Sequence, residues 1–260
     1  MPPLTISASA SGMTSSSKHS SQSSSNSGFA HKGEPGGTAI LLFSQGARSS
    51  AIQKPILVDS QSNEQLFELL INQARKLAQQ SGIPLVEVPE QHGDSFGSRL
   101  KSAYQEVFDQ GYNSVIALGD DCIGLQKTDL LQAQNLLSQG QAAIGPSNDG
   151  GTWLLGLTRT QFEQLDWEEL PWCSDGLFDA LLHALQSAGE MPERFLERKS
   201  DLDEASDWIT AFQEADKSFR KELVKLFEQS SLSASPAKAQ SWSSADRWSE
   251  QLLRAPPVGC

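Results

Sequence analysis

The chain has 260 residues, a formal net charge of −12 and a sequence pI of about 4.8. Such an acidic surface repels phosphate backbones, so a nucleic-acid partner is not expected. Three widely spaced cysteines without a CxxC motif do not indicate a disulfide framework and favour a reducing, cytoplasmic setting. No apolar run approaches the length of a transmembrane helix, so a membrane partner is not expected either.

The two ends of the chain are polar and rich in serine. Residues 1–37 carry too little apolar surface to offset their ordering entropy, and we predict a disordered extension. A transit peptide is the alternative, because no acid precedes Glu34, although arginine is also absent. Residues 230–260 are predicted to form a flexible tail, in which Trp242 and Trp248 could lie in a short helix. One domain is therefore expected, over residues 38–229.

Between these ends, apolar runs typical of strands alternate with amphipathic helical patterns. The expected strands are residues 38–43, 83–88, 114–119, 142–145 and 152–157. The expected helices are residues 62–80, a helix that has Arg99 in its first turn and ends near residue 110, and residues 128–139, 159–165, 174–188 and about 204–228. This alternation predicts an α/β fold with a mostly parallel sheet.

Acidic residues follow two of the predicted strands. Asp120 and Asp121 come directly after residues 114–119, and Asp149 follows residues 142–145. Open α/β sheets bind ligands at the carboxyl ends of their strands. Adjacent residues of a strand point to opposite faces, so only one of Asp120 and Asp121 is a good direct ligand for a metal. Mg²⁺ commonly takes one or two protein carboxylates, and Asp203 is the second candidate.

Each of these acidic groups also has a purely structural interpretation. Asp120 and Asp121 could form a turn that caps the next helix, and Asp201, Asp203 and Asp207 could cap the last helix.

The sequence holds further polar candidates. The loop 44–54 contains Arg48 and Lys54, and it could face phosphates or be an ordinary surface loop. Arg99 opposes the dipole of its helix, which favours an anion contact over a solvated side chain. Gly150 and Gly151 form either a tight turn or a place where a ligand approaches the backbone. No GxSxG, HExxH or kinase signature is present, and the four histidines are far apart.

Four short motifs together resemble a known bacterial family. They are Gln91 with Gly97-Ser98-Arg99, Gly119-Asp120-Asp121-Cys122, Gly145-Pro146 with Asp149-Gly150-Gly151, and Trp172-Cys173-Ser174. The combination resembles a glycosyltransferase-like family of the nucleotide-diphospho-sugar transferase superfamily over about residues 38–210. The resemblance implies a single GT-A-like (Rossmann-like) domain with three α/β/α layers. It also implies a nucleotide-sugar or nucleotide ligand over the strand ends, held with a divalent metal (Mg or Mn).

The resemblance also implies roles for individual residues. Asp121 and Asp203 would hold the metal, with Asp120 as a neighbouring nucleotide- or substrate-binding candidate. Asp149 would be catalytic on the acceptor side, and Gly150 and Gly151 would line the sugar or acceptor. Arg99 would face the nucleotide phosphates. The family's first loop reads like P..G..KTRL and here reads SQGARSSAIQK, so Arg48 and Lys54 are the cations that could replace that run.

The expected activity is therefore that of a metal-dependent transferase with a nucleotide-activated sugar donor and a small-molecule acceptor. A nucleotidyltransferase of the same fold is the close alternative. The second alternative is a catalytically inactive GT-A domain that binds a nucleotide or a protein partner. The altered first loop favours this alternative. The sequence predicts no oligomeric state.

Overall fold

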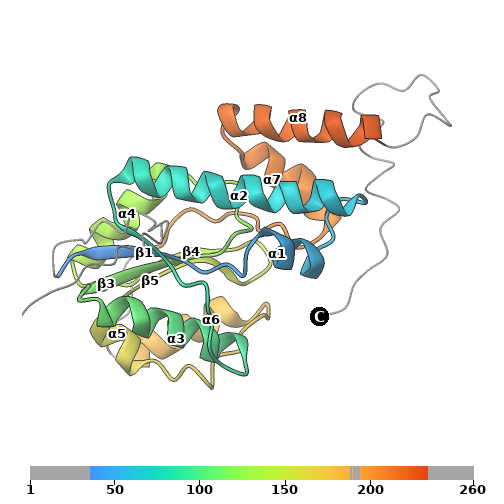
Figure 1. The fold of residues 1–260 in the computed structure, drawn as a ribbon. Helices are drawn as coiled ribbons and strands as arrows, with labels where there is room; N and C mark the ends of the chain where they lie inside the picture. The colour runs from blue at the N-terminus through green and yellow to red at the C-terminus, as the bar shows by residue number, and fades with distance from the viewer. Residues whose placement is uncertain (1–35, 188, 190–193, 234–260) are drawn as a thin grey trace, which may run out of the picture.

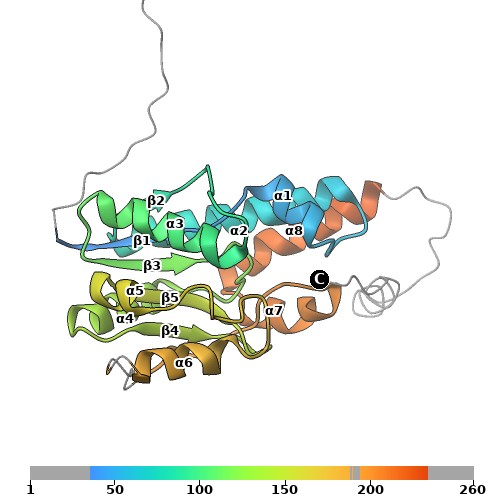
Figure 2. The same ribbon diagram turned by 90° about the horizontal axis from the view of Figure 1, so that it is seen from below.

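A five-stranded sheet forms the centre of the computed structural model, which describes residues 36–187, 189 and 194–233. Nearly all of the predicted extension and most of the predicted C-terminal tail lie outside the described residues. The strands are β1 (Thr38–Leu42), β2 (Leu85–Glu87), β3 (Ser114–Leu118), β4 (Ala143–Pro146) and β5 (Thr152–Thr158). Their order across the sheet is β2-β1-β3-β5-β4, and Figure 2 shows β1, β3, β5 and β4 in succession.

Four of the five strands run in the same direction. β1 pairs in parallel with β2 and β3, whereas β5 is antiparallel to both β3 and β4. The prediction of a mostly parallel sheet is thus confirmed. Because β1, β2, β3 and β4 share a direction, their carboxyl ends meet at one edge of the sheet.

Helices cover both faces of the sheet, which explains the uninterrupted apolar runs in its strands. The α2 (Ser60–Ser81) and α4 (Lys127–Ser138) helices cover one face (Figure 1). The α3 (Phe96–Asp109), α5 (Arg159–Gln164) and α6 (Leu177–Ser187) helices cover the other. Every residue of β3 is buried, as expected for a strand with helices on both sides. The result is the three-layer α/β/α arrangement.

A separate cluster of buried apolar side chains attaches the C-terminal part of the chain to the outer side of α2. It includes Phe67 of α2, Trp208 at the start of α7 (Trp208–Glu214), and Phe219 and Phe227 of α8 (Lys217–Ser233). Figure 1 shows α8 lying along α2. This packing brings the segment before α7 back to the carboxyl edge of the sheet.

The observed helices differ from the predicted ones in three places. An unpredicted helix, α1 (Ala47–Gln53), forms inside the expected loop 44–54 and packs on α2. The α2 helix begins earlier than expected, because Asp59 accepts a hydrogen bond from the backbone N–H of Ser62 at 2.7 Å.

The predicted last helix, 204–228, is the third difference, because it is broken into η1 (Ala205–Asp207), α7 and α8. Asp216 accepts hydrogen bonds from the backbone N–H groups of Ser218 and Phe219, and so starts a new helix. Within residues 36–187, 189 and 194–233, no helix is both long and apolar enough to span a bilayer.

Candidate functional site

Four segments that are distant in sequence meet at the carboxyl edge of the sheet. They are the loop after β1, the loop 119–126 after β3, the loop 147–151 after β4, and residues 199–203. The last segment lies between the other loops, because single bridges join Lys199 to Ser147 and Asp201 to Cys122. The backbone N–H of Leu202 also donates to the carbonyl of Asp121 at 3.1 Å. These bonds fix the late acidic segment beside the Asp121 loop.

Lys54 joins the two predicted metal ligands. Its Nζ lies 2.5 Å from Asp121 Oδ2 and 2.5 Å from Asp203 Oδ1. Because both oxygens bind one nitrogen, they are at most 5.0 Å apart. Burial lowers the pKa of Lys54, but the charges of Asp121 and Asp203 outweigh this effect and raise it, so the side chain carries a positive charge at neutral pH. Three residues named from sequence thus form one ionic cluster.

Asp120 points to different partners. It accepts hydrogen bonds from the hydroxyls of Ser44 and Ser50, the latter at 2.6 Å. Burial raises the pKa of Asp120, and the neighbouring charge of Asp121 raises it further. The side chain therefore ties the Asp121 loop to α1, and through α1 to Lys54.

Asp201 belongs to the site although sequence reasoning did not select it. Its Oδ2 accepts a hydrogen bond from the Ser147 hydroxyl, and its Oδ1 is buried without a partner among the described residues. Burial, followed by the charge of Asp121, raises the pKa of Asp201 to about 8. The available signal was its spacing of two from Asp203, since alternate residues of an extended segment share a face.

Asp149 borders the same acidic region as Asp201 and Asp203. A hollow of about 250 Å³ lies beside the lysine cluster. Its lining consists of Asn148, Asp149, Ser200, Asp201, Asp203, Ser206 and Asp207. No described lysine or arginine lines it, so the hollow favours a cation or a ligand rich in hydrogen-bond donors such as hydroxyls.

The predicted glycine pair contacts the chain's own backbone. Gly150 has a φ of +94°, and a Cβ built on it would lie 2.1 Å from the carbonyl oxygen of Asp175. The carbonyl of Gly150 also accepts a hydrogen bond from the N–H of Phe178 at 3.0 Å. At Gly151 a Cβ would meet Asp149 Oδ1 at 3.2 Å. Gly150 thus allows the β4–β5 loop to pack against the segment that precedes α6.

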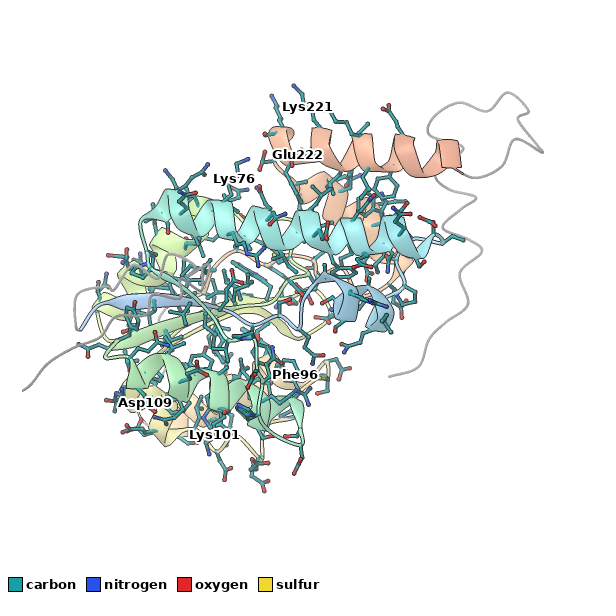
Figure 3. The ribbon with its side chains drawn as sticks, viewed as in Figure 1. Lys76, Phe96, Lys101, Asp109, Lys221 and Glu222 are labelled. Carbon is teal, nitrogen blue, oxygen red and sulfur yellow. The ribbon has the colours of Figure 1, made fainter. Side chains whose placement is uncertain are left out.

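The two arginines predicted to bind phosphate lie apart from the ionic cluster of Lys54, Asp121 and Asp203. Arg48 is exposed on α1, and Arg99 is half-buried in the first turn of α3. Neither forms an ion pair with any described carboxylate, and the Nε of Arg99 is buried without a partner there. The amide of Gln91 is likewise buried and unpartnered within the described part of the chain. Figure 3 labels Phe96, the first residue of this helix, whose ring packs edge-on against Phe43 after β1.

The positions of the Asp121 and Asp203 carboxylates suit a hard cation such as Mg²⁺. Asp121 and Asp203 offer oxygen ligands around a single point, and Mg²⁺ is commonly held by one or two carboxylates, with phosphate and water completing its shell. Among the described residues, however, no group of three or more His, Cys, Asp and Glu side chains is arranged to hold a metal. The residues therefore fit a cation that shares its ligands with a bound phosphate, not an all-protein cage.

A bacterial protein family matches the part of the chain that carries most of this edge. Residues 47–173 match the model of the family described as "Uncharacterized protein conserved in bacteria (DUF2064)". The family resemblance indicated by the motifs is thereby confirmed. No curated protein gives a significant match to the chain.

Solved structures resemble the chain at low sequence identity. A protein from Desulfovibrio desulfuricans G20, described as a "putative nucleotide-diphospho-sugar transferase", is 19% identical with a TM-score of 0.56, covering 74% of this chain and 97% of its own. Rv0371c from Mycobacterium tuberculosis H37Rv is 14% identical with a TM-score of 0.44, covering 68% and 98%. A structure of Rv0371c in complex with manganese is 15% identical with a TM-score of 0.42 and the same coverage. The predicted GT-A-like α/β fold is confirmed.

Proposed function

We propose that residues 38–229 form a cytoplasmic, metal-dependent transferase that uses a nucleotide-activated sugar as its donor and a small molecule as its acceptor. The observation that carries this proposal is the convergence of Asp121 and Asp203 on one cation position at the carboxyl edge of the sheet. The fold supports it as well, since a neighbour with this architecture is described as a "putative nucleotide-diphospho-sugar transferase". Fold alone does not define a reaction, so the ionic cluster bears most of the weight.

In this proposal Asp121 and Asp203 hold a Mg²⁺ or Mn²⁺ ion. Such an ion would supply Lewis-acid neutralisation of the charge on a diphosphate leaving group. Lys54, Arg48 and Arg99 contribute positive charge toward the phosphates. The unpartnered Nε of Arg99 is one donor that a phosphate oxygen would satisfy.

The acceptor side is assigned to the β4–β5 loop. Asp149 borders the acidic hollow and can accept a proton from an acceptor hydroxyl or orient it. Gly150 and Gly151 keep that loop close to its neighbours, and Asp120 supports the loop that carries Asp121.

The experiment is a thermal-shift screen with nucleotides and nucleotide-sugars, each with Mn²⁺, with Mg²⁺ and with EDTA. A ligand at a hundred times its Kd stabilises a folded protein by about 2.7 kcal/mol. We expect a shift with at least one nucleotide-sugar that is larger with metal, and we expect Asp121→Asn to remove the metal-dependent part. The absence of a metal-dependent shift with every ligand would contradict the proposal.

A catalytically inactive nucleotide-binding domain is the second candidate, because Lys54 is already neutralised by two carboxylates. It predicts a nucleotide shift that does not depend on metal and no turnover of the bound ligand. The reaction products distinguish a nucleotidyltransferase from a glycosyltransferase. It would release pyrophosphate from a nucleoside triphosphate, whereas a glycosyltransferase releases a nucleoside phosphate from the nucleotide-sugar.

A further inference from the structure

The position between Asp121 and Asp203 is already filled by a cation from the chain itself. The Nζ of Lys54 is 2.5 Å from one oxygen of each carboxylate. A Mg²⁺ ion bound to the same two oxygens would sit about 2.0–2.1 Å from each. The ammonium group and the metal would therefore need nearly the same point in space, and two cations cannot share it.

The backbone of Lys54 is fixed, whereas its side chain has room to move. Its N–H donates to the carbonyl of Ser50 at 2.8 Å, and its carbonyl accepts from the side chain of Asn63 at 2.9 Å. The side chain is 26% exposed, which leaves a path toward solvent at the edge of the sheet. A rotation of the long side chain, without a change in α1, is enough to free both carboxylates.

The structure therefore points to a role for Lys54 that differs from simple phosphate binding. We propose that Lys54 is a placeholder cation, which competes with the divalent metal for Asp121 and Asp203 and leaves them when the metal arrives. This inference rests on the proposed function, because it takes the two aspartates as metal ligands. It implies that the free protein binds metal weakly, and that phosphates, which give the displaced ammonium a new partner, strengthen metal binding.

The test measures Mn²⁺ affinity without nucleotide, from the loss of the free-ion EPR signal. These ion pairs lie at the partly exposed edge of the site, and at about 0.2–1 kcal/mol for each pair, removing both should lower the Kd for Mn²⁺ by about 2- to 30-fold in Lys54→Met. Lys54→Arg keeps the charge and should retain weak binding. Lys101→Met is the matched control, because Lys101 is exposed on the outer side of α3, away from the cluster (Figure 3).

A second readout guards against a poorly folded variant. Without Lys54 the two carboxylates repel each other, so Lys54→Met should melt at a lower temperature than wild type in EDTA. Mn²⁺ should then raise its Tm more than it raises that of wild type. Tighter binding together with this larger rescue supports the competition.

Other results would overturn the inference in distinguishable ways. Equal Mn²⁺ affinity in wild type and Lys54→Met refutes the competition but leaves the proposed metal ligands standing. No Mn²⁺ binding in either protein, with or without a nucleotide, refutes the metal assignment itself. If nucleotides still stabilise the protein in that case, the inactive nucleotide-binding domain becomes the better description.

Discussion

Lys199, the first residue of the site segment 199–203, forms a buried ion pair with Asp129 of α4. The Nζ of Lys199 lies 3.2 Å from Asp129 Oδ2, and both side chains are at least 90% buried. The same ammonium group lies 5.4 Å from the centre of the Trp153 ring. Since Lys199 also bonds through its backbone to Pro146 and Asn148, the pair connects the start of α4 to the segment that carries Asp201 and Asp203.

Loss of one partner of this pair should be costly. We expect Asp129→Asn to lower the free energy of unfolding by about 3–5 kcal/mol, because it leaves the Lys199 ammonium buried without a counter-charge. Urea denaturation measures the change. Asp109→Asn, on the outer side of α3 (Figure 3), should change stability by less than about 0.5 kcal/mol. The double variant with Lys199→Met should recover most of the loss, and an unaltered loss in that variant would show that the ion pair is not the cause.

The stability of the metal-free protein should fall as pH rises from about 4 to 8. Asp201 has a folded-state pKa of about 8 against an ordinary value of 3.8, since burial and the charges of Asp121, Asp203 and Asp149 disfavour its ionisation. Between those values the folded state holds a proton that the unfolded state has lost. The contribution of Asp201 to stability is therefore full below the pKa of the unfolded state and is lost as pH rises through the pKa of the folded state. Over this range the free energy of unfolding falls by less than about 1.4 kcal/mol per pH unit.

This dependence is measured by denaturation in EDTA across the pH range. Asp201→Asn should flatten the curve and raise stability at pH 8, because its amide stays neutral there while its oxygen can still accept from Ser147. A curve that keeps its slope in Asp201→Asn would assign the proton to another group.

Gly150 and Gly140 allow backbone strain to be separated from steric overlap. Both have positive φ, +94° and +77°, but a Cβ at Gly140 meets nothing within 4 Å, whereas at Gly150 it meets the Asp175 backbone at 2.1 Å. Gly140→Ala should cost about 1–2 kcal/mol from strain alone. Gly150→Ala should cost at least about 2 kcal/mol more, measured by urea denaturation, because the loop must also move away from Asp175. Similar losses of stability in both variants would mean that the loop can move away from Asp175 with little further loss of stability.

The acidic run from Asp203 to Asp207 should divide into two roles. Asp207 accepts hydrogen bonds from the backbone N–H groups of Asp203 and Glu204, so Asp207→Ala should cost about 1 kcal/mol of stability as a lost cap. It should keep a metal-dependent thermal shift. Asp203→Asn should lose that shift, because it weakens the oxygen pair around Lys54. The reverse pattern would reassign the second metal ligand to Asp207.

Much of the sheet could be predicted because its strands carry strong local patterns. The run 115–118 is apolar throughout, and the glycine and aspartate after it indicate the end of β3. The α1 helix escaped prediction because its sequence, ARSSAIQ, has little periodicity. Its ordering depends on tertiary contacts, with Ser50 bonded to Asp120 and the helix packed on α2.

The site was predictable where strand ends determine it and not where long-range contacts do. Asp121 follows from the topology, since parallel strands bring their carboxyl ends together. The position of Lys54 between Asp121 and Asp203 follows from the packing of α1 and of residues 199–203, neither of which leaves a local signal. Asp201 looks like a helix cap in the sequence, and only its burial against Ser147 separates it from Asp207.

The loop that carries Asp149 joins two strands that pair with each other in antiparallel register, so it is the turn of a hairpin. An insertion or deletion of one residue in the hairpin pairing would turn the side chains of one strand to the opposite face of the sheet. The loop after β3 leads into α4 instead, and its length is restricted by the burial of Ile123 and Leu125 and by the bridge from Cys122 to Asp201. Insertions or grafted segments should therefore be rejected at residues 122–126 as well as at residues 147–151.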